Sequence, residues 1–468
     1  MKKIILFTAA ILSLTTVDAQ VSFRKMQNMI PRSKDGLNMF DVRKDDVPFD
    51  GISVDLGGAF AMQFQALNSF NDQREGSYIA SNGAVISGNS GTAGYRLNNL
   101  QNNFNLPAAN LTVGAQLADG VHVNLDVYLS SRHHNETWVK GGYLQIDKLD
   151  FIKKDFLTDI MKYTTIKIGQ MENNYGDAHF RRTDNGNALL NPFIEGNIMD
   201  SFETEMGMEV YYNREGLVSM IGITNGKLNQ GVAEFIPAEA TPTAPDPNTT
   251  VSPTILAKLG YDKQLNKDLR VRITGSYNHN ANMSANPWGS DRAGSRYFGV
   301  MSHQAYSYNG VPNPNNFDPA SNATTGRFSP GYANWYTAFM INPFVKYRGL
   351  EFFGTLEFTN GGDKKGSDAS RSVDQYAADL VYRFGKTEQF YIGARYNVVS
   401  GNISSQTEKV NVDRFESSLG WYMTKNIIAK LAYTNQKYSD YSQYSGSSLN
   451  DLYGGSFDGI MFEAAITF

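Results

Sequence analysis

The chain ends in Gly459-Ile460-Met461-Phe462-Glu463-Ala464-Ala465-Ile466-Thr467-Phe468, where an apolar side chain takes every second position. Successive side chains of a β-strand point to opposite faces, so this pattern gives the strand one fully apolar face. A strand of this kind, ending the chain on an aromatic residue, is how transmembrane β-barrels of outer membranes finish. We therefore expect a barrel with lipid outside and water inside, and we expect the barrel-assembly machinery to bind Phe468.

The start of the chain predicts export. Residues 1–19 have the charged start, the short apolar stretch and the small-residue end of a secretory signal. Residues 20–50 mix charges of both signs, and we expect a periplasmic N-terminal segment there, ahead of a barrel that occupies residues 51–468. The chain contains no cysteine, which excludes disulfides, thiolate metal sites and a lipoprotein anchor.

The composition fits many strands joined by polar loops. The 468 residues include 43 glycines and 26 tyrosines, and 12% of the chain is aromatic. A mean hydropathy of −0.38, with no long apolar run, excludes a helical membrane protein. A barrel explains the low mean hydropathy, because each apolar lipid-facing residue of a strand alternates with a polar residue that faces the interior. The net charge of −4 argues against nucleic acid as a partner.

Period-two alternation, interrupted by turn residues, predicts an all-β, up-and-down antiparallel barrel of about sixteen strands, within a range of fourteen to eighteen. The predicted strands are 51–65, 110–117, 121–131, 138–147, 164–171, 204–213, 217–224, 254–261, 269–278, 335–347, 350–359, 373–384, 390–399, 410–423, 427–437 and 459–468.

The connections between these strands alternate in length. Long connections such as 66–109 and 279–334 alternate with short ones such as 118–120, as expected for external loops and periplasmic turns. Two connections depart from the alternation, the short external one at 132–137 and the long periplasmic one at 148–163. Apolar residues spaced along 148–163 predict a short helix there.

The segment Ile166-Lys167-Ile168-Gly169-Gln170-Met171, which runs into Asn174-Tyr175-Gly176, resembles a fifth-strand segment of the sixteen-stranded porins. The resemblance is to the superfamily of substrate-preferring channels of the phosphate and dicarboxylate type. Asn174-Tyr175 stands where that group has Pro-Phe, which leaves the substrate class open. The resemblance implies a homotrimeric Gram-negative outer-membrane porin through which small hydrophilic solutes or ions diffuse passively.

In that family the loop after the fifth strand folds into the barrel and narrows it. The corresponding loop here is 172–203, and its charges are mostly acidic. They are Glu172, Asp177, Asp184, Glu195, Asp200 and Glu203, against Arg181 and Arg182. A loop inside a lumen can hold such charge because water reaches it. The alternative is an ordinary outer loop in water.

Strand parity directs a set of basic side chains into the lumen, since Arg or Lys at the lipid midplane would cost ~2–4 kcal/mol each. The set is Arg270, Arg272, Arg383, Arg395, Arg414 and Lys430. Facing the acidic loop, they would form a charged constriction with weak selectivity. The alternative is that these bases pair with wall acids such as Glu351, Asp379 and Glu416 and brace the barrel.

The sequence offers little support for catalysis. Of the six histidines, His122 alone lies within a predicted strand, in lumen parity with Asn124 and Asp126. A hydrolase would need a histidine beside a nucleophile or acid. We therefore expect no enzyme, no metal and no cofactor. An anion- or phosphate-preferring porin, and a non-conducting adhesin or scaffold barrel, remain the alternatives.

Overall fold

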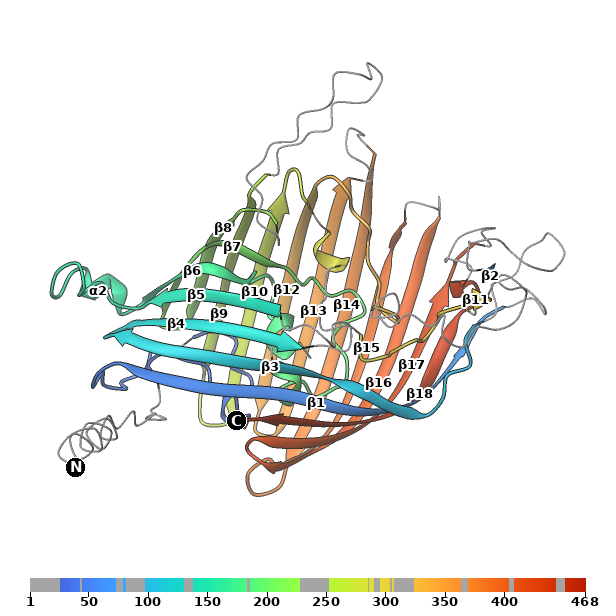
Figure 1. Ribbon diagram of the computed structural model, residues 1–468, viewed down its shortest axis with the longest axis horizontal. Coiled ribbons are helices and arrows are strands. Elements are labelled where there is room, and N and C mark those ends of the chain that lie inside the picture. The colour runs from blue at the N-terminus through green and yellow to red at the C-terminus, as the bar shows by residue number, and fades with distance from the viewer. Residues whose placement is uncertain are drawn as a thin grey trace, which may run out of the picture.

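The computed structural model describes residues 26–42, 44–72, 79–80, 97–129, 138–182, 186–227, 252–284, 286–289, 295–303, 305–306, 324–362, 369–403, 408–442 and 451–468. The predicted signal, residues 1–19, lies outside these ranges. Within them, 16 antiparallel strands form one closed barrel (Figure 1). The last strand, β18 (Ser456–Thr467), pairs with the first, β1 (Ser53–Phe70), so that Phe462 lies opposite Phe64.

The barrel strands lie at the positions that the alternation predicts, and the prediction of about sixteen strands is confirmed. Those between β1 and β18 are β3 (Asn103–Ala118), β4 (Val121–Leu129), β5 (Trp138–Ile146), β6 (Thr164–Glu172), β7 (Thr204–Arg214), β8 (Leu217–Thr224), β9 (Thr254–Gln264), β10 (Leu269–Asn280), β12 (Tyr336–Tyr347), β13 (Leu350–Gly362), β14 (Ser370–Phe384), β15 (Phe390–Asn402), β16 (Lys409–Thr424) and β17 (Ile427–Ser439).

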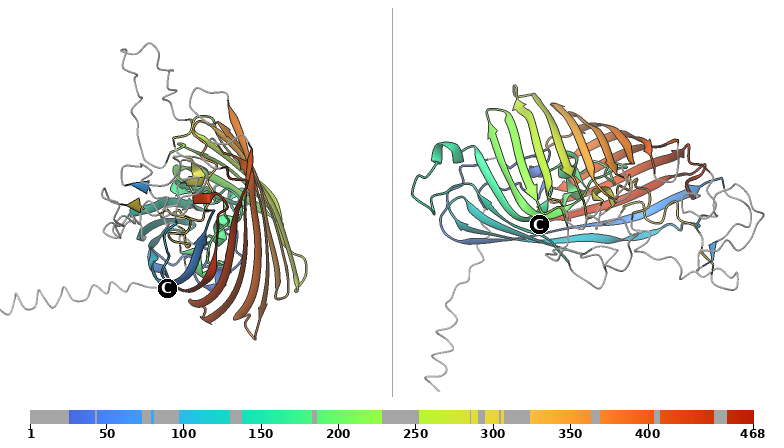
Figure 2. Two further views of the ribbon diagram at one scale, coloured as in Figure 1. Left: turned by 90° about the vertical axis from the view of Figure 1, so that its right-hand side faces the viewer. Right: turned by 90° about the horizontal axis from the view of Figure 1, so that it is seen from above.

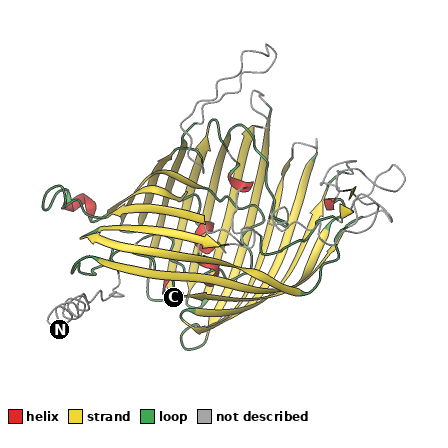
Figure 3. Cartoon of the chain, in the orientation of Figure 1, coloured by secondary structure: helices red, strands yellow, loops and turns green. Residues whose placement is uncertain are grey.

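The remaining elements are short. β2 (Ile79–Ala80) and β11 (Ala305–Tyr306) form a separate two-stranded parallel sheet. The helical elements are η1 (Lys34–Gly36), α2 (Thr158–Met161), η2 (Ala178–Arg181), η3 (Asn187–Leu189) and η4 (Pro287–Gly289), and α2 confirms the short helix expected within 148–163. Figure 3 shows how little of the fold is helical. No helix in the described part of the chain has the length and apolarity that crossing a membrane requires.

The two faces of the wall differ as the alternation predicts. Outward side chains such as Leu259, Leu380 and Ile392 are large, apolar and exposed, whereas inward ones such as Arg383 and Gln436 are buried. A continuous apolar outer face on a closed antiparallel sheet is the structure of a transmembrane barrel, because closure leaves no unpaired strand edge in lipid.

Toward the loop end of the barrel this polarity reverses. Val373, Val399 and Val412 point inward and are fully buried, while the neighbouring Asp374 and Asp413 lie on the outside. The reversal arises because loop segments fill the interior at this level with an apolar core, while the outer face has passed beyond the lipid. Several strands therefore run further than predicted, as β1 does to Phe70 and β3 does from Asn103.

The core of the molecule thus lies inside the barrel. Ile198 and Met199 of the segment after β6 pack there with Tyr297, Phe328 and residues of the inner wall. The two views of Figure 2 show the wall curving around an interior through which loop segments pass. One open cavity lies on the side of the barrel nearest β3 to β7, as described below.

Residues 26–42 cross the turn end of the barrel, within its rim. The amide of Lys34 donates to the carbonyl oxygen of Lys425 in the β16–β17 turn, at 2.7 Å. Asn38 Nδ2 donates to Glu351 Oε1 on the inner face of β13, also at 2.7 Å. A segment that looks suited to solvent therefore lies against the interior, because the inner wall supplies partners for its polar groups.

A cluster of three aromatic rings also anchors this segment to the inner wall. The ring of Phe40 lies 5.2 Å from that of Phe344 and 5.9 Å from that of Phe353, measured between centroids. All three rings are buried. The segment therefore combines polar anchoring at several points with one apolar anchor at β12 and β13.

The outer face yields a stability prediction. Leu259 lies at the middle of β9, and Leu259→Arg should cost about 2–4 kcal/mol of unfolding free energy in a bilayer. Leu265 is similarly exposed but follows β9 in the turn, so Leu265→Arg should cost only about 0–1 kcal/mol, as near an interface. Urea unfolding in liposomes, followed by tryptophan fluorescence, measures both. Equal losses would contradict a lipid-facing β9.

Candidate functional site

The segment between β6 and β7 lies inside the barrel, and inward side chains of β14 to β17 hold its backbone. The amide of Ile198 donates to Asn397 Oδ1 at 2.6 Å, and Arg414 donates to the carbonyl oxygen of Gly196 at 3.0 Å. Lys430 Nζ donates to the carbonyl oxygens of Ala188 and Phe193 at 2.7 and 3.0 Å. We call residues 173–182 and 186–203, the described part of this connection, the inward segment.

Asp177 anchors the start of the inward segment to the opposite strands. Its carboxylate accepts from Arg272 at 2.8 and 3.0 Å, from Lys258 at 3.1 Å and from Thr274 at 2.7 Å. Arg272 also pairs with Asp41 of the N-terminal segment. Burial alone would raise the pKa of Asp177, but Lys258 and Arg272 hold that pKa well below its usual range. The cluster therefore ties three parts of the chain together through buried charges.

The other basic residues predicted on the late strands are also buried in pairs. Arg270 contacts Asp262 at 2.6 Å, Arg383 contacts Glu351 at 2.9 Å, Arg395 contacts Asp379 at 2.6 Å, and Lys430 contacts Glu463 at 2.5 Å. Arg414 donates to Gln436 at 2.7 Å and lies 3.9 Å from Glu416. The structure thus brings these six bases to wall acids and to the inward segment. Their role in ion passage stays a prediction.

Arg182, Glu195 and Asp200 of the inward segment are also paired, whereas Glu203 Oε2 has no hydrogen-bond partner among the described residues. Asp184 lies outside the described residues. Arg182 pairs with Asp200 at 2.8 Å and with Glu172 at the end of β6, while Glu195 pairs with Arg327 at 2.8 Å. Arg181 is different. Its guanidinium lies 3.7 Å from both Glu351 and Asp379 and donates no hydrogen bond to any described residue.

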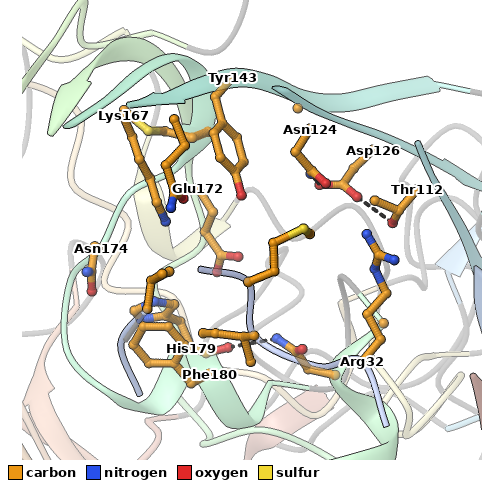
Figure 4. Close-up of a pocket in the computed structure, with 18 of the residues that line it drawn as sticks. Arg32, Thr112, Asn124, Asp126, Tyr143, Lys167, Glu172, Asn174, His179 and Phe180 are labelled. Atoms are coloured by element: carbon orange, nitrogen blue, oxygen red, sulfur yellow. Dashed lines mark hydrogen bonds between the residues drawn. The ribbon is translucent and has the colours of Figure 1, made fainter. Parts of the chain in front are cut away.

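A polar cavity of about 260 Å³ separates the inward segment from the wall formed by β3 to β7 (Figure 4). The N-terminal segment, from Asn28 to Arg32, closes part of it. Among the predicted site residues, Glu172 lines this cavity. Cationic groups in the lining are Arg32, Lys140 and Lys167, and anionic ones are Asp41, Asp126, Glu172 and Glu209.

Several of these lining groups are held in place by neighbours. Asp126 accepts from Thr112 at 2.6 Å and from Asn124 at 2.7 Å. Arg32 pairs with Asp55 at 2.6 Å. Figure 4 shows Arg32 and Lys167 on opposite sides of the cavity, with Tyr143 directed into the space between. The cavity therefore presents fixed groups of both signs to whatever enters it.

Lys167 lines the cavity without an acidic partner among the described residues. Its Nζ lies 5.2 Å from the ring centres of Tyr143 and Tyr211, and it forms no ion pair with a described residue. Lys167, Asp126 and Lys140 were not among the predicted site residues, because that prediction rested on basic residues of the late strands. The parity of His122, Asn124 and Asp126 was the signal that pointed to this wall.

His122 lies in the cavity lining, but its Nδ1 atom has no hydrogen-bond partner among the described residues. The described residues also hold no group of three acids and histidines placed to bind a metal ion. What the site offers chemically is a water-accessible surface of mixed charge.

No known family model matches the sequence, and no curated protein matches it. Solved structures of low similarity include OmpT of Vibrio cholerae, 10% identical, covering 91% of this chain and 100% of that one, with a TM-score of 0.46. An anion-selective porin from Comamonas acidovorans is 11% identical, with 89% and 100% coverage and a TM-score of 0.47. Salmonella typhi OmpF is 10% identical, with 90% and 99% coverage and a TM-score of 0.47. The architecture of this chain rests on its own strand pairing.

The Asp177 cluster yields a second prediction. Asp177→Asn leaves the buried Lys258 without its acid and removes one of the acids around Arg272, so it should cost about 3–5 kcal/mol of unfolding free energy at neutral pH. Asp268→Asn, which removes a 3.6 Å contact to Arg348 in an exposed turn, should cost only about 0–1 kcal/mol. Urea unfolding of both variants in the same lipid gives the comparison.

The pH dependence of that difference follows from the lowered pKa of Asp177. The stabilisation is fully present above the unfolded pKa of about 3.9 and is lost as pH falls through the lowered folded value. The gap between wild type and Asp177→Asn should therefore stay constant from neutral pH down to that unfolded value. A gap that closes already near neutrality would contradict the assignment.

Proposed function

We propose that this chain is an outer-membrane porin through which small hydrophilic solutes or ions diffuse passively. The observation that carries the proposal is the polar cavity enclosed by a barrel whose outer face is apolar. Polar groups that face an enclosed space in a membrane are expensive unless water fills that space. A water-filled path through lipid is what a diffusion channel requires.

The packing of the interior supports a narrow path along β3 to β7. The inward segment and the apolar core fill much of the interior, and the cavity beside the inward segment lies against Thr112, Asn124 and Lys167. Fixed groups of both signs line it, which supports weak charge selectivity. The six bases of the late strands have acids or carbonyl groups as partners, so they lend no particular support to an anion preference.

The remaining parts of the proposal come from the sequence. After export by the signal at residues 1–19, the short turns, the start of β1 and the end of β18 would face the periplasm. The barrel-assembly machinery would bind Phe468. Homotrimer assembly is implied by the porin resemblance. Residues 26–50 would then form the periplasmic side of the channel.

A non-conducting scaffold or adhesin barrel is the second candidate, and the dry core inside the barrel favours it. Tyr297, Phe328 and Tyr336 are buried within the wall, in a region that an open pore would leave wet. The two candidates differ in whether the purified protein conducts ions across a planar bilayer. Absence of conductance would overturn the porin proposal and leave the scaffold.

The path itself can be tested with single cysteines, because the chain has none of its own. Asn124→Cys puts a thiol in the cavity lining, whereas Ser418→Cys puts one on the inner face of β16, where the interior is packed. A charged methanethiosulfonate reagent should lower the single-channel conductance of Asn124→Cys and leave that of Ser418→Cys unchanged. The reverse result would move the path to the other side of the barrel.

The N-terminal segment gives a further prediction for the same recordings. Residues 27–42 and 44–47 lie in none of the barrel strands, so a deletion of residues 27–47 keeps every strand pair. Single-channel conductance should rise in this variant because the turn-side mouth widens. Heat-modifiable gel mobility serves as the control for a folded barrel. Unchanged conductance in a folded variant would show that the segment does not limit flow.

A further inference from the structure

The connection between β5 and β6 projects from the turn end of the barrel (Figure 1). We call residues 148–162, which include α2, the spur. Its backbone is well defined by local hydrogen bonds, among them Ile152 N to Leu149 O and Phe156 N to Lys153 O, at 2.9 and 3.0 Å. Asp155 and Leu157 adopt left-handed backbone conformations, with φ of 61° and 53°. The spur therefore presents its side chains in a fixed arrangement.

Five large apolar side chains of the spur are exposed. They are Phe151, Ile152, Phe156, Leu157 and Ile160. Ile152 is 61% exposed, close to the 64% of Leu259 on the lipid-facing wall. An ordered segment that displays so much apolar surface to water is unfavourable, so another surface must cover it.

The base of the spur lies at the level of an aromatic pair on the wall. Tyr163 follows the spur directly, and its ring lies 6.0 Å from that of Tyr212 near the end of β7. Arg214 and Lys162 lie over the Tyr163 ring, at 5.0 and 5.3 Å. Tyrosines flanked by basic residues are typical of the membrane–water interface. The spur thus begins where the apolar wall meets the headgroups.

The charges of the spur suit the same surroundings. It carries four lysines and three aspartates, and Lys153 and Lys154 lie directly beside the exposed Ile152. Neither of these two lysines forms an ion pair with a described residue. Long lysine side chains beside buried apolar groups reach phosphate oxygens while their stems stay in the apolar layer.

We infer that the spur docks on the turn-side leaflet of the membrane, with its apolar side chains inserted at the acyl boundary and its lysines among the lipid phosphates. Lipid is the occupant that the observations favour, because the spur begins at the Tyr163–Tyr212 pair beside the lipid-facing wall and carries lysines among its exposed apolar side chains. The inference depends on the transmembrane barrel and not on whether the barrel conducts.

The test uses one cysteine placed in the otherwise cysteine-free, full-length chain, labelled with an environment-sensitive nitrobenzoxadiazole dye and reconstituted in phosphatidylcholine–phosphatidylglycerol vesicles. Ile152→Cys and Ile160→Cys report on the spur, and Lys267→Cys in the β9–β10 turn is the matched control at the same end. The spur labels should emit at shorter wavelength, be quenched by brominated lipid and resist iodide. The Lys267→Cys label should show the opposite behaviour.

Two outcomes would overturn the inference. Iodide quenching of both spur labels as strong as that of the control would place the spur in water. Self-quenching that grows with protein density, without quenching by brominated lipid, would make a second copy of the chain the cover. Because the two spur positions are independent, failure of one variant to fold leaves the other as a valid reporter, and gel mobility identifies the folded one.

Discussion

Closure of the sheet is the constraint on which the rest of the structure depends. A strand in lipid has no water to satisfy its backbone, so every amide and carbonyl group must pair with a neighbouring strand. β1 meets this requirement by pairing with β3 on one side and with β18 on the other. Once the wall is closed, its inner face is a confined polar surface. Segments that enter the barrel can form hydrogen bonds and ion pairs with the side chains of that surface.

Those contacts explain the filled interior. The inner wall is rich in charged side chains, and most of them form ion pairs within the chain. Arg395 with Asp379 and Lys430 with Glu463 are examples. The inward segment and residues 26–42 each gain partners by entering. One cavity remains beside β3 to β7, where Lys167 lies near two tyrosine rings and forms no ion pair with a described residue. Most of the predicted basic residues on the inner wall therefore have partners within the chain.

The sequence predicted the wall closely and the interior poorly, for a physical reason. Alternation depends only on which side of a strand is apolar, so Leu259 and Arg272 could be assigned to faces from their positions alone. Which side chains form ion pairs or hydrogen bonds in the interior depends instead on distances across the barrel. Nothing local in Asp41 indicates that it binds Arg272, and the polar composition of residues 20–50 suited solvent equally well. The inward valines at the loop end, such as Val399, could not be interpreted without knowing that a core fills that level.

The position of residues 26–42 has a consequence for the order of assembly. Asn38 and Asp41 bind Glu351 and Arg272, which lie 313 and 231 residues further along the chain. Neither partner has its final position until the late strands have joined the sheet. Residues 26–42, which precede every barrel strand in the chain, are therefore among the last to reach their native place. Until the late strands have joined the sheet, the turn-side rim of the nascent barrel lacks its N-terminal segment. Docking of that segment is therefore a late step of assembly.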